Sequence, residues 1–101
     1  MAYGSDTKVK ERLQIDSATY DTEIATCLTE ADAWIDETID QYTDVPITGT
    51  APAAIVAISN DMAAGIFCQN HRGEFEKMLG TFDGRARENL EVYIRNNYFL
   101  F

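Results

Sequence analysis

Positive charge is missing from the middle of this 101-residue chain. Between Leu13 and His71 there is neither Lys nor Arg, whereas the same span holds ten Asp and Glu residues, and the whole chain has a formal net charge of −9 at pH 7. Nucleic-acid-binding proteins need cations that displace the counterions of the phosphates. The charge distribution therefore disfavours specific binding of DNA or RNA. It suits a halophilic host, because high salt screens the repulsion among carboxylates.

Long apolar runs are also missing. The most apolar stretch, residues 51–67, is interrupted by Ser59, Asn60 and Asp61. It is shorter than the roughly 20 apolar residues that a transmembrane helix needs. The first residues contain no apolar run behind a basic region, as a secretory signal would. We therefore expect no membrane segment and interpret residues 51–67 as part of a core helix.

The sequence has few residues for catalysis or metal binding. Cys27 and Cys68 form no CxxC pair, so we interpret both as small buried hydrophobic residues of a protein that folds in a reducing cytoplasm. The single histidine, His71, follows Cys68 by three positions, and a thiol enzyme built on this pair is a disfavoured interpretation. Neither HExxH, GxSxG nor a glycine-rich phosphate loop is present. We expect no enzymatic activity and no cofactor.

What the chain does contain is helical periodicity. Apolar residues recur every three or four positions from Ile24 to Tyr42 and again from Ile55 to Ile66. We expect one all-α domain over residues 1–101, a small bundle of about four helices with a loop between the second and third helices and an apolar C-terminal tail. The predicted helices are 6–14, 21–42, 52–72 and 84–97, with one or two further helical turns around 75–79.

Short polar residues and glycine mark the predicted helix ends. Ser5, Asp21 and Asp83 are predicted N-caps, because such side chains accept hydrogen bonds from free backbone N–H groups. Gly73 is predicted to end the third helix, with His71 in its last turn. That helix is rich in Ala and Gly, so we expect it to be the central post that neighbouring helices approach closely. Its Asn60 and Asp61 must lie at a wet edge or have a partner.

Four aspartates spaced by four residues form an acidic stripe on the second predicted helix and just beyond it: Asp32, Asp36, Asp40 and Asp44. Like charges at this spacing repel one another. We interpret the stripe as solvated, screened or used as a negative surface, in preference to a metal site, because no second ligand motif accompanies it.

The order of these features resembles that of the head-tail connector, or adaptor, proteins of tailed viruses. The resemblance covers most of residues 5–97 and includes "EADAWIDETI" in the long second helix, "AIVAISNDMAAGIF" in the third and "RARENLEVYI" in the last. The positions that match are packing positions: Ala31, Ile35 and Asp36 in the second helix, and Pro52, Ile55, Ala57, Asp61, Ala63 and Ala64 in the third.

This resemblance implies a structural virion protein without catalytic activity. Such proteins form a ring at the viral neck, commonly a dodecamer, beneath the portal protein. The ring extends the DNA channel, lets DNA pass without binding it specifically, and offers a docking surface for a stopper or tail protein. Assembly takes place in the host cytoplasm. In that setting the acidic stripe either lines the channel or faces solvent, and the sequence leaves this choice open.

Two segments are candidate protein interfaces. The first is the loop between the second and third helices, with Val45, Pro46, Ile47 and Thr48, which together with the slender third helix could supply the unlike contacts of a ring. The second is the apolar tail, Tyr98, Phe99, Leu100 and Phe101. Aromatic side chains bury a large area with few rotors, so this tail suits a groove of the portal or of the next subunit. The alternative is that it folds back onto its own core.

A small DNA-binding regulator is the alternative function, with the second and third helices as a helix-turn-helix. Its only support is the set of basic residues Arg85, Arg87 and Arg95 on the last helix. A recognition helix needs Lys or Arg that face phosphates, and the second and third helices contain none before Arg72.

Overall fold

The computed structural model describes residues 3–78 and 80–98, and within them every regular element is helical. The all-α prediction is therefore confirmed. The elements are α1 (Asp6–Leu13), α2 (Asp21–Ile39), α3 (Ala53–Asn70), the short 3-10 helix η1 (Glu76–Met78) and α4 (Thr81–Tyr98). The loop expected between the second and third helices runs from 40 to 52.

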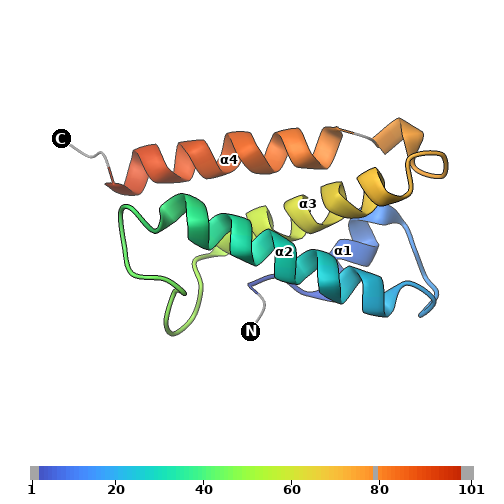
Figure 1. Ribbon diagram of the computed structural model, residues 1–101, viewed down its shortest axis with the longest axis horizontal. Helices are drawn as coiled ribbons and strands as arrows, with labels where there is room; N and C mark the ends of the chain where they lie inside the picture. Colours follow the sequence, from blue (N-terminus) through green and yellow to red (C-terminus); the bar gives the residue numbers. More distant parts are fainter. Residues whose placement is uncertain (1–2, 79, 99–101) are drawn as a thin grey trace.

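The central element is α3, as its small residues predicted. It contacts α1, α2, α4 and η1. In Figure 1 it lies between α2 and α4 and runs antiparallel to both, while α1 packs near its C-terminal half. The molecule is elongated, 44 × 25 × 18 Å. The apolar core lies where these helices meet, and its largest fully buried side chains are Leu13, Ile24, Ile35, Ile39, Ile55, Ile58, Phe67 and Leu90.

One close approach explains how α4 packs so near α3. A Cβ atom built on Gly65 of α3 would lie 2.8 Å from the backbone nitrogen of Asp83 and 3.0 Å from its Cα. Only glycine fits at this position without movement of the α4 backbone. Ala63 and Ala64, beside it, are fully buried.

Several predicted helix ends are confirmed or displaced by a few residues. Ser5 is the N-cap of α1 and accepts a hydrogen bond from Lys8 N. Asp21 is not an N-cap: α2 begins at Asp21 after Tyr20, and the Asp21 carboxylate contacts the Lys10 ammonium. The end of α2 is Ile39 instead of Tyr42.

Asp83 is not an N-cap either, because α4 begins two residues earlier, at Thr81. Gly80 has a φ of 86°, a left-handed conformation that glycine adopts readily, and it turns the chain into α4. Phe82 is buried in the first turn and fixes that start. Asp83 instead binds Arg87 one turn further along.

The predicted stop of α3 at Gly73 is also wrong. The helix ends at Asn70, and His71 follows as the C-cap residue. The His71 ring stacks on Phe67, with centroids 4.4 Å apart, and its Nε2 lies 2.7 Å from Glu23 Oε2. These contacts hold His71 out of the helical path, so glycine is not needed to end the helix.

Candidate functional site

The three polar residues in the middle of α3, Ser59, Asn60 and Asp61, are buried, and we call them the polar centre. Asp61 is 3 % exposed. Its Oδ1 accepts a hydrogen bond from Arg12 Nε of α1 at 2.6 Å. Arg85 of α4 donates to both carboxylate oxygens, at 2.9 and 3.1 Å. A buried carboxylate is stable only when paired. Of the two alternatives expected for Asp61, a wet edge or a partner, the structure shows the partner, and this residue connects three helices.

The other two residues of the polar centre hold the segment before α1. Gly4 N donates to Ser59 Oγ at 3.2 Å, and Ser5 N donates to Asn60 Oδ1 at 2.9 Å. A Cβ atom on Gly4 would overlap the Asn60 amide oxygen, so the backbone approaches closely only because this residue is glycine. The polar centre is therefore satisfied by structural partners.

Two aspartates of the predicted acidic stripe belong to this same network. Asp32 Oδ1 accepts from the Ser59 hydroxyl at 2.7 Å, and Asp32 Oδ2 accepts from Tyr3 N at 2.9 Å. The Tyr3 hydroxyl donates to Asp36 Oδ1 at 2.5 Å and accepts from Ile47 N at 2.9 Å. Burial and the bond to Asp36 raise the pKa of Tyr3 to about 12.

The acidic stripe is therefore not one continuous surface. Asp32 is only 8 % exposed, so its assignment to a channel or solvent face is wrong. The cause is the segment at Tyr3, which covers this face of α2 and supplies the hydrogen bonds that a buried carboxylate needs. Burial raises the pKa of Asp32, although the bonds from Ser59 and Tyr3 oppose the shift. Asp36 is half-buried, and Asp40 and Asp44 are exposed.

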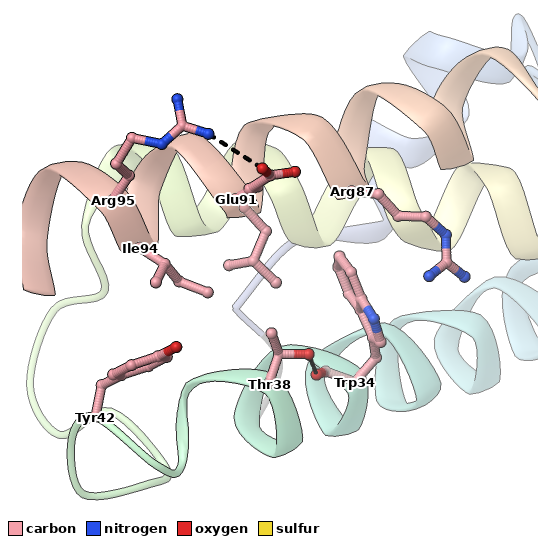
Figure 2. A pocket seen from close by; sticks show the side chains of 8 residues that line it. Trp34, Thr38, Tyr42, Arg87, Glu91, Ile94 and Arg95 are labelled. Carbon is pink, nitrogen blue, oxygen red and sulfur yellow. Dashed lines mark hydrogen bonds and ion pairs between the residues drawn. The ribbon is translucent and has the colours of Figure 1, made fainter. Parts of the chain in front are cut away.

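A groove separates α2 from α4, because both helices pack on α3 and make little contact with each other. It has a volume of about 470 Å³. Figure 2 shows Trp34 and Thr38 on one wall and Ile94 on the other, with Tyr42 at one end. Leu90, which is 1 % exposed, forms part of its floor.

The rim of the groove on the α4 side is charged. The Arg87 guanidinium lies over the Trp34 ring, 5.6 Å from its centroid, and also binds Asp83. Arg95 Nη2 donates to Glu91 Oε1 at 3.1 Å (Figure 2). A guanidinium group is attracted to the face of an aromatic ring. Sequence patterns did not reveal this groove, because it is formed by helices that are distant in the chain.

The loop of the predicted interface forms a second hollow. Its residues from Pro46 to Ala51 enclose, with Tyr3 and Val56, a space of about 760 Å³. Val45 and Ile47 are half-buried against the core, whereas Pro46 and Thr48 are exposed. The hollow is lined by uncharged residues alone.

The uncharged stretch continues from this loop into the first half of α3. Residues 45–60 include no charged side chain. A shallow groove of about 370 Å³ lies between the N-terminal half of α3 and the last turns of α4. We call the exposed residues that line it the uncharged surface: Ala54, Asn89, Val92, Asn96 and Asn97. Val92 is 41 % exposed and is the one exposed large apolar side chain among the described residues.

Of the predicted apolar tail, the structure describes Tyr98. Its ring stacks on Tyr42, with centroids 5.4 Å apart and an angle of 10° between the rings. It also meets the edge of Tyr93 at 6.0 Å. Phe99, Leu100 and Phe101 lie outside the described residues. Tyr98 thus lies at the Tyr42 end of the groove.

The residues of the disfavoured thiol site are in structural positions. Cys27 and Cys68 are buried, as predicted, and burial raises the pKa of both thiols. His71 contacts Glu23 and Glu74.

Within residues 3–78 and 80–98, the structure shows no cluster of acidic, histidine or cysteine side chains suited to a metal ion. No helix of that part of the chain has the length and apolar character to cross a membrane.

Comparison of the chain with protein-family models, with curated proteins and with solved structures finds no significant match.

Proposed function

We propose that this protein is a structural subunit of a viral neck, a head-tail connector that assembles into a ring beneath the portal protein. In this role it extends the DNA channel and joins the head to a stopper or tail protein. Its side chains serve packing and assembly, and it carries out no reaction. The resemblance of the helix order to connector proteins is the starting point of the proposal.

The observation that carries the proposal is the separation of charge on the surface. A chain with a net charge of −9 repels other copies of itself. The repulsion between two copies is weakest where carboxylates are absent, and the loop with Pro46 and Thr48 and the uncharged surface around Val92 provide such areas. Exposed apolar or uncharged patches on a strongly charged protein are typical of interaction sites.

The acidic side of the molecule fits the same role. The exposed Asp40 and Asp44 continue the negative face of α2, which contains no Lys or Arg. Facing a channel, such a wall repels DNA phosphates and keeps DNA from binding during passage. The described geometry favours the connector over the DNA-binding regulator, because the connection from 40 to 52 is much longer than the turn of roughly 3–4 residues in a helix-turn-helix.

Assembly in solution tests this proposal. We expect light scattering after size exclusion, with electron microscopy of the same fractions, to show rings, and molar salt to promote them by screening the negative charge. A single added carboxylate should discriminate between surfaces. Val92→Glu adds a charge to the uncharged surface and should prevent assembly, whereas Thr29→Glu adds the same charge at an exposed position of α2 and should not.

Two results would contradict the proposal. One is a chain that stays monomeric at all salt and protein concentrations and does not bind portal-bearing heads. The other is a stable dimer that binds duplex DNA, which would favour the regulator.

A further inference from the structure

The groove between α2 and α4 is suited to an apolar, aromatic ligand. Its walls are formed by Trp34, Ile94 and Tyr42, and its floor includes Leu90. Ligand sites are typically concave and mostly apolar, with a few polar groups that fix orientation. Here those groups are Arg87, already over the Trp34 ring, and the pair Arg95–Glu91 on the rim.

The chain itself contains a segment with this chemistry. Phe99, Leu100 and Phe101 follow α4 directly and carry two aromatic rings, one branched aliphatic side chain and no charged side chain. Aromatic side chains bury large areas, and an arginine beside the site can add a cation–π contact. Acidic side chains in a ligand would meet the negative α2, whereas uncharged side chains meet no such repulsion.

The position of Tyr98 determines which copy can supply this segment. Its ring stacks on Tyr42, so the described part of α4 stops at one end of the groove. The Trp34 end lies beside Arg87, about 16 Å back along α4 at a rise of 1.5 Å per residue. Residues 99–101 span at most about 11 Å when extended, and they would first have to reverse direction. They cannot reach Trp34 of their own chain.

From this geometry we infer that the Trp34 half of the groove binds Phe99–Phe101 of a second copy of the chain. The inference rests on the proposed function, since it names the contact that joins neighbouring subunits. Each copy donates one segment and offers one groove, so the contact is head-to-tail. Such unlike contacts close into rings when the rotation between subunits allows it.

Trp34 makes the groove directly observable, because it is the one tryptophan of the chain. The receiver in the experiment is the chain with Phe99→Ser, Leu100→Ser and Phe101→Ser, which keeps Trp34 and loses the apolar segment. The donor is the chain with Trp34→Phe, which keeps the segment and does not contribute tryptophan emission. The control donor combines Trp34→Phe with the three serine substitutions. Circular dichroism checks that all of them retain the native helix content.

We expect the receiver emission to shift to shorter wavelength as the donor is added, to saturate, and not to respond to the control donor. The native chain should show the same shift at high concentration and lose it on dilution. A shift of the native chain that does not depend on concentration would place the segment in its own groove and overturn the inference. The absence of any shift would also overturn it, and would assign the segment to the portal or to the core.

Light scattering of the receiver alone separates this inference from the proposed function. If the donor causes no shift and the serine-substituted chain still forms rings, the groove contact is wrong and the connector remains. If the donor causes no shift and neither the native chain nor the receiver assembles, both proposals fall.

Discussion

The polar centre and the α2–α4 groove use the same residue type in opposite ways. Arg85 of α4 reaches the buried carboxylate of Asp61, whereas Arg87 and Arg95 of the same helix form ion pairs within one helical turn at the surface. The first interaction joins distant parts of the chain at a buried carboxylate, although the Arg85 side chain itself is 48 % exposed. The others hold guanidinium groups beside an open groove. We infer that the burial of the partner, more than the presence of an ion pair, decides whether an arginine stabilises this fold or remains available to a ligand.

The largest effect is expected from removing both cations of the polar centre. Arg12→Met with Arg85→Met leaves the Asp61 carboxylate buried without a charged partner, so we expect the free energy of unfolding to fall by about 3–5 kcal/mol. Urea denaturation measures this change. The matched control, Arg87→Met with Arg95→Met, removes two exposed ion pairs and should cost less than about 1 kcal/mol. Equal losses in the two double variants would remove the distinction between the regions.

The second prediction concerns the close approach that brings α4 within reach of Asp61. Gly65→Ala places a methyl group against the Asp83 backbone and should lower the free energy of unfolding by about 1–3 kcal/mol. Gly84→Ala is the matched control on α4, because open space surrounds that position. It should stabilise the protein by about 0.5–1 kcal/mol through helix propensity. A neutral Gly65→Ala variant would show that the two helices can separate without loss.

Much of the fold could be predicted because its signals are local. The spacing of apolar residues marks α2 and α3, and the small residues of α3, including Gly65, predict a central position. The helix ends were predicted less well, because nearby packing competes with capping. Phe82 becomes buried and moves the start of α4 ahead of Asp83, and the contacts of His71 end α3 before Gly73.

The partners within the site could not be predicted, because they lie far apart in sequence. Asp61 is 49 residues from Arg12 and 24 from Arg85. A charged residue in the middle of an apolar helix does signal a buried pair, but it does not identify the partner. The spacing of Asp32 and Asp40 is equally uninformative about burial. The segment at Tyr3 buries Asp32 and leaves Asp40 exposed.

The third prediction uses the pH dependence of that buried aspartate. Burial raises the pKa of Asp32 in the native state above its unfolded value of about 3.9. The native protein therefore holds this proton to higher pH, and the stability contributed by Asp32 is lost as pH rises through the raised pKa. The free energy of unfolding of the native chain minus that of Asp32→Asn should fall over this window and then level off. Asp40→Asn removes the same charge from an exposed position and controls for net charge. A flat difference would contradict the burial of Asp32.

The smallest effect on stability is expected at the groove, where the same substitution also tests ligand binding. Arg87→Met removes the cation over Trp34 and an exposed ion pair with Asp83, so the free energy of unfolding should change by less than about 1 kcal/mol. If the guanidinium serves a ligand, the same substitution should weaken the concentration-dependent shift of Trp34 emission several-fold. Arg85→Met reverses this pattern, because its partner lies in the polar centre: it should lower stability and leave groove binding unchanged. Loss of both properties in both variants would mean that the two arginines stabilise one structural unit, and that the groove has no role separate from the fold.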